Sequence, residues 1–282
     1  MRAWSWFKEH VVLIIGLLAL AYMLLPILII AIFSFNDPQG KFNFEWVGFT
    51  TEYWTKPFAI TGLTDALLVS LRLAFLTSIG ATILGTLIAI ALVRYQFFGR
   101  KATNLLIVIP MATPEIVIGA SLLSMFLIYG ANLGFTTLLI AHIMFSISFV
   151  VVVVRSRLIG FDRRLEEAAA DLGANAFTTF RKITLPLIAP GVLSAGLLSF
   201  ALSIDDFVIS NFNSGSEVTF PLYIYGANQR GIPVQVNVIA TMLFAVTILA
   251  MLAVILQQKR AEKAAAMRPE EAANKPAISI PV

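Results

Sequence analysis

Residues 167–186 read EAAADLGANAFTTFRKITLP, and this stretch is the polar exception in an otherwise apolar chain. It lies between two long hydrophobic runs, at about 135–154 and 187–209. Two such runs are typical of membrane spans, and a polar, helix-prone insert between them has little use unless something outside the membrane binds it. We therefore interpret the insert as a docking element.

The first half of the insert predicts a short helix. Asp162 is a candidate N-cap, and Glu166 and Glu167 lie near the positive end of the helix that it would start. Gly173 is well placed to end that helix, because glycine adopts the left-handed conformation without strain. Small side chains at 168–170 would let another backbone or side chain approach closely.

The second half predicts another short helix. Asn175 can cap it, and Phe177, Phe180 and Ile183 recur every three residues to form one apolar stripe. Pro186 is expected to bar its continuation, because proline removes a backbone donor and clashes with the preceding turn. The insert is thus expected to be two short helices bent at a glycine, or else an amphipathic hairpin on lipid headgroups.

Composition places the whole chain in a membrane. Of 282 residues, 59% are hydrophobic and only 13% are charged, with a mean hydropathy of +0.87. No cysteine is present and His10 and His142 are the only histidines, which excludes disulfides, thiolate metal sites and a histidine cluster. We expect no metal site. The net charge of +4 is scattered over loops, which argues against nucleic-acid binding.

Apolar runs long enough to cross about 30 Å of hydrocarbon define an all-α integral membrane protein. We predict six transmembrane helices, at about 11–33, 66–93, 104–128, 135–154, 187–209 and 235–256. The first is too long for the apolar core of a signal peptide, so we interpret it as an uncleaved span. The expected organisation is an N-terminus at 1–10, a transmembrane domain at 11–256 with a loop at 155–186, and a largely disordered tail at 257–282.

The distribution of basic residues predicts the orientation. All 20 Lys and Arg residues fall in the N-terminus, 94–103, 155–186 and the tail, except Lys41, Lys56, Arg72 and Arg230. Loops rich in Lys and Arg face the cytoplasm. Both termini and the insert are therefore expected there. The aromatic-rich loop at 34–65 would lie outside, as an interfacial belt or as a contact for an external partner.

Glu115 is the clearest ionisable residue within a predicted span. It lies about eleven residues into the third span, near mid-depth at about 1.5 Å per residue. Pro110 and Pro114 precede it and interrupt the helical hydrogen bonds, which is tolerated at membrane depth only where protein or a water-filled cavity satisfies the freed groups. We expect Glu115 to face such a cavity.

Asp205 and Asp206 lie near the outer end of the fifth predicted span. Either they face the same cavity, or they are interfacial carboxylates with one bonded to Arg72 or Arg230. His142 in the fourth span is expected to be a satisfied interhelical hydrogen bonder.

The balance of charge favours a cationic cargo. Three carboxylates face only one nearby intramembrane cation, and carboxylates bind ammonium groups by charge-assisted hydrogen bonds. Two separated acidic sites fit an elongated dication. Aromatic faces could add cation–π attraction, the candidates being Phe126, Phe207, Phe212 and Tyr223.

The insert also resembles a known family. Its pattern of Glu167, Ala168 and Ala169, then three residues, Gly173, nine residues and Ile183-Thr184-Leu185-Pro186 is similar to the EAA motif of permease subunits of bacterial ABC importers. The runs 114–123, 199–210 and 220–225 resemble spermidine/putrescine permeases of the PotC and PotI type, in which Asp stands at the position of Glu115. The resemblance implies the type I importer permease fold, with residues 167–173 as a coupling helix inserted in an ATPase groove. The implied coupling residues are Glu167, Ala168, Ala169, Gly173, Ile183, Leu185 and Pro186.

The same resemblance implies a division of labour between chains. No G-x-x-x-x-G-K-[ST] motif occurs, so ATP and Mg²⁺ belong on a separate ATPase, and this chain is a transport subunit without a cofactor or covalent chemistry. The implied partners are a homologous second permease, two ATPase subunits, a periplasmic binding protein and lipid of the bacterial inner membrane. The implied polyamine contacts are Glu115, Asp205, Asp206, Phe207 and Tyr223.

Two other functions are compatible with the residues. One is an ABC permease for another solute, such as an amino acid, an opine or iron(III). The other is a secondary transporter driven by Na⁺ or H⁺, which usually shows internal repeats that this sequence lacks.

Overall fold

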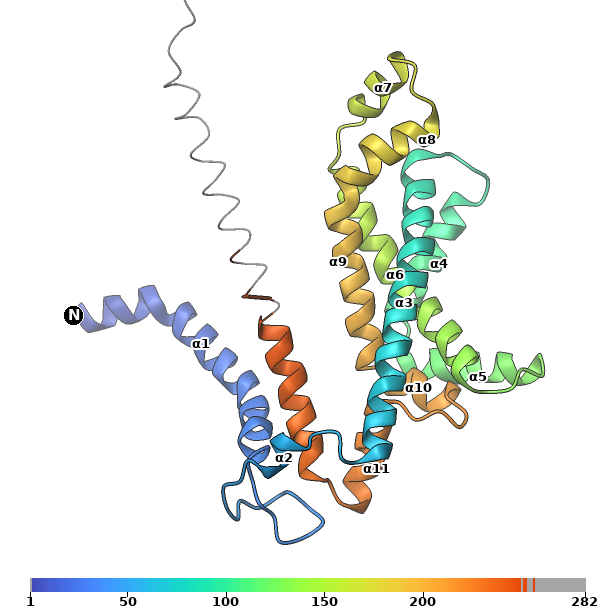
Figure 1. Ribbon diagram of the computed structural model, residues 1–282. Coiled ribbons are helices and arrows are strands. Elements are labelled where there is room, and N and C mark those ends of the chain that lie inside the picture. Colours follow the sequence, from blue (N-terminus) through green and yellow to red (C-terminus); the bar gives the residue numbers. More distant parts are fainter. Residues whose placement is uncertain (1, 250, 253–255, 257–282) are drawn as a thin grey trace, which may run out of the picture. The chain divides into compact units, whose positions relative to one another are not determined.

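A computed structural model describes residues 2–249, 251–252 and 256, with side chains from residue 10 onward. The regular elements in this part are helices, and one isolated bridge joins Asn36 to Phe49. In chain order (Figure 1) they are α1 (Arg2–Phe33), α2 (Glu52–Thr55), α3 (Thr61–Arg94), α4 (Arg100–Ala112), α5 (Glu115–Ile128), α6 (Phe135–Ile159), α7 (Arg164–Asp171), α8 (Ala176–Thr179), the π-helical η1 (Phe180–Thr184), α9 (Leu185–Ile204), α10 (Val208–Asn213), α11 (Phe220–Arg230) and a helix over Val234–Leu249.

The chain divides into two compact units, which we describe separately. Unit 1 comprises the described residues up to Ala59 and those from Gly231 onward, and unit 2 is Ile60–Arg230. The predicted disordered tail, 257–282, lies outside the described residues.

Four described helices are long and apolar enough to cross a membrane, and a bent pair makes up to five. They are His10–Phe33, Thr61–Arg94, Phe135–Ile159 and Ala176–Ile204, together with the pair α4 and α5. The helix over Val234–Leu249, in the sixth predicted span, is apolar but shorter, and the rest of that span is only partly described. The expectation of an all-helical membrane protein is confirmed.

The third predicted span is not one helix. α4 and α5 meet at an angle of 114°, and the break falls at Thr113 and Pro114. Pro114 has no N–H to continue the ladder, and the N–H groups of Val117 and Ile118 bond back to its carbonyl, which starts α5 in a new direction. The expected interruption by proline is confirmed, but a straight helix over 104–128 is wrong.

The fifth predicted span begins and ends earlier than 187–209. Helical structure runs continuously over Ala176–Ile204, so Pro186 does not stop the second short helix as predicted. Instead the chain widens into η1, where Leu185 N–H bonds to the carbonyl of Phe180, five residues back. A π turn leaves room for a proline in the first turn of α9, so the short helix and the span become one continuous element.

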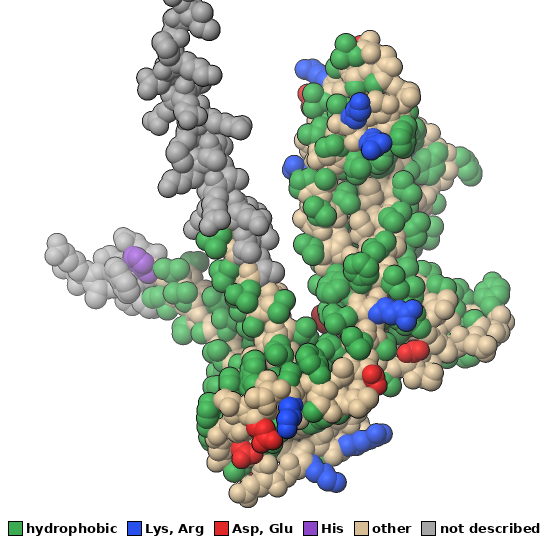
Figure 2. Space-filling model, viewed as in Figure 1, with side chains coloured by type: hydrophobic (Ala, Val, Ile, Leu, Met, Phe, Trp, Pro, Cys, Tyr) green, Lys and Arg blue, Asp and Glu red, His purple; other side chains and the backbone are tan. Residues whose placement is uncertain are grey.

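The core of unit 2 is a three-helix packing of α3, α6 and α9. Glycine lets the helices approach: a Cβ on Gly85 would lie 2.6 Å from Val150 Cγ1. Buried aliphatic side chains such as Val154 and Ile188 fill the centre. Apolar side chains also cover the outer flanks (Figure 2), which is expected where lipid is the solvent.

Unit 1 contains α1 and an ordered loop after it. None of the most apolar window of α1 is buried within the chain, as expected for a helix that is apolar all round. In the loop, Asn36 Nδ2 donates to Asn43 Oδ1 at 2.6 Å and to the Glu45 carbonyl at 2.7 Å. The Phe35 ring stacks on both Phe49 and Trp54. The loop is therefore held by a buried amide pair and an aromatic stack.

Candidate functional site

The insert forms the bent helical pair that its caps predict. Asp162 Oδ1 accepts a hydrogen bond from Arg164 N–H at 3.0 Å and so supports the start of α7, although the N-cap position is Arg163, one residue later than predicted. At the other end Ala174 N–H bonds to the Ala169 carbonyl, and Gly173 N–H to the Ala170 carbonyl. This is the Schellman arrangement, and Gly173 occupies its left-handed position with φ +82°. The predicted bend at Gly173 is confirmed.

The exposed tip of the insert has an apolar component. Asn175 Oδ1 accepts from Thr178 N–H at 2.8 Å and caps α8, as expected. Leu172 is 90% exposed and Phe177 is 70% exposed, next to the exposed Glu167 and Ala168. Sequence reasoning missed Leu172, although a leucine beside a glycine in a polar insert is a usable signal. Large exposed apolar side chains on a polar element are typical of an interaction surface.

The predicted coupling residues fall into two groups. Glu167, Ala168 and Gly173 are exposed on α7 and its C-terminal turn, and Ala169 is half-buried beside them. The remaining three lie where η1 joins α9, with Ile183 and Leu185 half-buried and Pro186 exposed. Figure 2 shows Lys and Arg side chains near α7 and α8, at this end of unit 2.

Glu166 anchors the insert to the helical core. Its Oε2 lies 3.1 Å from Arg94 Nε, and its Oε1 accepts a hydrogen bond from Thr184 Oγ1 at 2.7 Å. The Arg94 guanidinium also lies over the Phe161 ring at 5.2 Å. A cavity of about 490 Å³ adjoins this contact and is lined by residues of α3, α7, α8 and η1. The sequence suggested only a helix-terminal role for Glu166.

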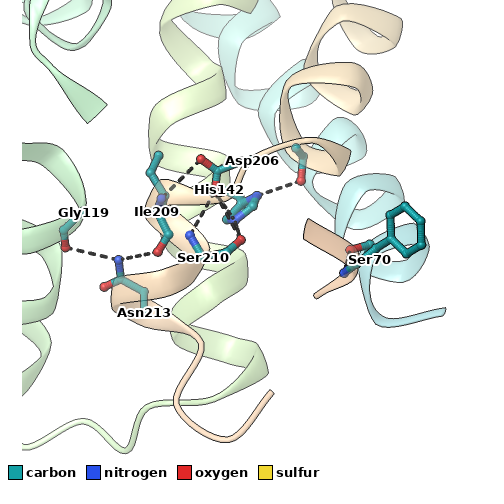
Figure 3. Close-up of polar contacts among 9 residues, drawn as sticks. Ser70, Gly119, His142, Asp206, Ile209, Ser210 and Asn213 are labelled. Carbon is teal, nitrogen blue, oxygen red and sulfur yellow. Dashed lines mark hydrogen bonds and ion pairs between the residues drawn. The ribbon is translucent and has the colours of Figure 1, made fainter. Parts of the chain in front are cut away.

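The acidic residues cluster where two helices break. Glu115 is the first residue of α5, and one turn later α5 packs closely on α10 at Gly119. A Cβ on Gly119 would lie 2.8 Å from the Phe212 ring, and Asn213 Nδ2 donates to the Gly119 carbonyl at 3.2 Å (Figure 3). A Cβ on Gly119 would also lie 3.5 Å from Ile209 Cα, and Ile209 N–H donates to Asp206 Oδ1, so the start of α5 and the Asp205–Asp206 break meet at the α5–α10 contact. The structure therefore brings the three predicted carboxylates into one region.

Asp205 and Asp206 do not lie within a helix, contrary to expectation. α9 ends at Ile204 and α10 begins at Val208, so both aspartates occupy the break. Asp205 is exposed, whereas Asp206 is only 8% exposed. Asp206 Oδ1 accepts from Ile209 N–H at 3.2 Å, and Oδ2 accepts from Ser210 N–H at 2.9 Å. This carboxylate therefore bonds two amides in the first turn of α10, directly after α9 ends.

His142 joins three elements, as Figure 3 shows. Its Nδ1 lies 2.8 Å from Ser203 Oγ on α9, and its Nε2 lies 3.1 Å from Ser210 Oγ on α10. Nε2 also lies 3.3 Å from Asp206 Oδ2. The expected interhelical hydrogen-bonding role of His142 is confirmed.

The suggested ion pair of an aspartate with Arg72 or Arg230 is not formed. Within the described residues Asp206 contacts the His142 ring, while Arg72 lies over the Phe135 ring with its Cζ 4.6 Å from the centroid.

The aromatic candidates are only partly where they were expected. Phe207 contacts the ring of Tyr225 at 4.8 Å between centroids, whereas Tyr223 lies toward Gly62 of α3. Residues two apart on a helix point about 200° apart, so the Tyr-x-Tyr pattern could not select the face. Phe126 is buried in the core and Phe212 lies against Gly119.

An all-helical chain with membrane-crossing helices, clustered carboxylates at helix breaks and a protruding two-helix insert is a multi-pass membrane transport subunit. Residues 81–263 match the family of binding-protein-dependent transport system inner membrane components, and the chain belongs to that family. It is thus an ABC importer permease of the bacterial inner membrane. Membership also confirms that the chain is a transport subunit without a cofactor of its own, and not an enzyme.

Similar proteins cover nearly the whole chain. It is 42% identical to the Haemophilus influenzae spermidine/putrescine transport system permease protein PotC, over 84% of this chain and 91% of that protein. It is 36% identical to the Escherichia coli putrescine transport system permease protein PotI, over 89% of this chain and 92% of that protein.

Solved structures share the fold. A chain of a bacterial ABC transporter that imports the acidic polysaccharide alginate aligns with a TM-score of 0.65 over 92% of this chain and 98% of its own length, at 17% identity. A chain of an amino acid ABC transporter aligns with a TM-score of 0.55 over 75% of this chain and 99% of its own length, at 18% identity. At these identities the likeness concerns the fold alone.

Proposed function

We propose that this chain is the permease subunit of an ATP-driven importer that carries spermidine or putrescine into the cytoplasm by alternating access. The observation that carries the proposal is the set of carboxylates Glu115, Asp205 and Asp206 at two helix breaks that the packing of α5 on α10 brings together. The names of the relatives at 42% and 36% identity support the same cargo.

The chemistry of the cluster suits a polyamine. A protonated amine binds a carboxylate by a charge-assisted hydrogen bond, and several amines on one chain can engage several carboxylates. The ring pair of Phe207 and Tyr225 offers an apolar surface next to Asp205 for the methylene segments and cation–π attraction for an ammonium group. Tyr223 is included in the proposed contacts on sequence grounds.

The proposed assembly is a type I importer with six spans in this chain. The termini and the insert at 155–186 face the cytoplasm, and the partners are a homologous permease, two ATPase subunits, a periplasmic binding protein and membrane lipid. The insert docks on the ATPase through residues 167–173, where the exposed Leu172 supplies an apolar anchor. Closure of the ATPase pair then biases the spans toward the outward-open state, and hydrolysis resets them.

Uptake by cells that lack other polyamine routes tests the cargo. Labelled spermidine uptake should be competed by unlabelled putrescine but not by amino acids or iron chelates. Glu115→Gln and Asp205→Asn should each lower it roughly tenfold, the loss expected for one charge-assisted hydrogen bond. Unchanged polyamine uptake in both variants would favour another solute.

A separate experiment tests docking. Gly173→Pro and Glu167→Lys should abolish uptake and weaken co-purification with the ATPase while membrane insertion stays normal. Normal uptake in both would refute the docking surface. Transport by the isolated chain in liposomes without an ATPase would instead indicate a secondary transporter.

A further inference from the structure

The three clustered carboxylates differ sharply in what surrounds them. Glu115 and Asp205 are exposed, whereas Asp206 is buried and its two oxygens are turned into the protein (Figure 3). A polyamine that approached Asp206 would have to displace bonds that the protein already makes. The sequence shows three carboxylates of equal charge, but only Glu115 and Asp205 are accessible to a ligand in the structure.

Asp206 is committed to the start of α10. Its oxygens accept hydrogen bonds from Ile209 N–H, Ser210 N–H and, at 3.2 Å, Ser210 Oγ. These bonds satisfy amides that have no partner within a six-residue helix. Without the carboxylate, the first turn of α10 would lose its cap in a buried setting.

His142 fixes Asp206 from the side of α6 and α9. The proton of Ser210 Oγ goes to Asp206, so Ser210 Oγ can bond to His142 only by accepting from Nε2–H. Nδ1 then accepts from the hydroxyl of Ser203 on α9. His142, Ser203 and Ser210 are each at most 3% exposed, and the two ring nitrogens and two hydroxyls of this network find their partners in one another and in Asp206.

We propose that Asp206 and His142 are positioning residues whose hydrogen bonds fix the backbone between α9 and α10, an arrangement that we call the lock. Only Asp205 and Glu115 then contact the cargo by charge. This inference rests on the proposed function and assigns separate roles within its site. The lock holds the backbone of 205–207, which carries the Asp205 carboxylate and the Phe207 ring. α5 is held in the same way, because Asn213 of α10 bonds to Gly119.

Binding and transport separate the two roles. The complete permease–ATPase complex is placed in nanodiscs, and equilibrium binding of labelled spermidine is measured without the binding protein, whose own affinity would mask the site. Asp205→Asn and Glu115→Gln should weaken spermidine binding by roughly tenfold or more. Asp206→Asn and His142→Leu should change it less than about threefold but slow uptake by the reconstituted transporter at least about fivefold.

Coupling between the two positioning residues is the decisive readout. Because Asp206 and His142 act through one network, the double variant should transport no more slowly than the worse single variant. Pairing His142→Leu with Asp205→Asn should instead multiply the two defects. His142→Gln keeps a donor on the side of Ser210 and should recover part of the rate. Asp65→Asn, the same change at an exposed acid on α3, is the control.

If one of these variants does not assemble into the complex, the accessibility of an introduced thiol tests the same inference. The chain contains no cysteine, so a single introduced thiol reports its own accessibility. Asp205→Cys should react with a cationic methanethiosulfonate, whereas Asp206→Cys should stay unreactive.

Three outcomes are possible contradictions, and each one overturns a different claim. If Asp206→Asn weakens spermidine binding as much as Asp205→Asn, Asp206 is a direct ligand and the inference is wrong. If His142→Leu behaves as wild type while Asp205→Asn weakens binding, the proposed function survives without the lock. If neither Asp205→Asn nor Glu115→Gln weakens binding, the proposed cargo site itself is wrong.

Discussion

The carboxylate of Glu166 lies 3.1 Å from Arg94 Nε and also accepts a hydrogen bond from the Thr184 hydroxyl. It thereby ties the start of α7 to the end of α3 and to η1, which leads directly into α9. The two charged side chains are only 14% and 18% exposed. A movement of α7 must therefore be passed to both helices or must break this contact.

Glu166→Gln should destabilise the permease by about 2 kcal/mol, because it leaves the Arg94 charge without its carboxylate in a mostly buried place. It should also raise the ATP hydrolysed per spermidine imported, because α7 is no longer fixed to α3. Thermal unfolding of the assembled complex and the transport stoichiometry check the two effects. Glu167→Gln is the control for the unfolding measurement only. The ion pair of Glu167 with Arg163 is exposed and its N–O distance is 3.5 Å, so its loss should change stability little. An equal shift in both variants would contradict the anchor.

Gly173→Ala should cost about 1 kcal/mol and lower uptake, because φ at this position is +82° and a Cβ disfavours that conformation. Space is not the cause, since a Cβ there would meet nothing within 4 Å. Gly160→Ala is the matched control, because Gly160 has φ −75° and a Cβ would make only ordinary contacts. Co-purification with the ATPase should fall for Gly173→Ala only.

Gly119→Val should push α5 away from α10 and reduce transport, with overpacking of about 1–3 kcal/mol. The added side chain would overlap the Phe212 ring, so Phe212→Ala should restore part of the rate in the double variant. Ala120→Val enlarges a neighbouring position on the same helix that lines an open groove and should have a smaller effect. Uptake by the reconstituted complex measures all three, and failure of Phe212→Ala to improve Gly119→Val would argue against this contact.

Asn36→Ala should loosen the loop that follows α1. Asn36 Oδ1 accepts from Val47 N–H at 2.8 Å, and the amide also bonds to Asn43, so its loss leaves buried partners unsatisfied at a cost of about 1–3 kcal/mol. The expected result is faster limited proteolysis within 34–59. Gln39→Ala changes an exposed side chain in the same loop and should cleave at the wild-type rate.

The sequence by itself determined the features that depend on local chemistry. Apolar runs predicted the four long membrane-crossing helices and the bent pair of α4 and α5, because roughly twenty apolar residues suffice to span hydrocarbon. The cap at Asn175 and the bend at Gly173 were also readable, because each involves a residue and its neighbours within one turn. The same holds for the interruption before Glu115, which Pro114 imposes on its own backbone, although Pro110 is accommodated within α4.

The tertiary structure alone decided which polar groups are free and which are already bonded. Asp205 and Asp206 are chemically identical, yet one is exposed and the other is bonded to α10 and faces His142, a residue more than sixty positions earlier in the chain. Glu166 and Glu167 are likewise adjacent, and only the first reaches Arg94. The π turn that carries the helix through Pro186 was not predicted either, because its i to i+5 hydrogen bond leaves no residue pattern that the sequence analysis could use. Burial and long-range partners depend on how helices pack, and no local pattern in the sequence records them.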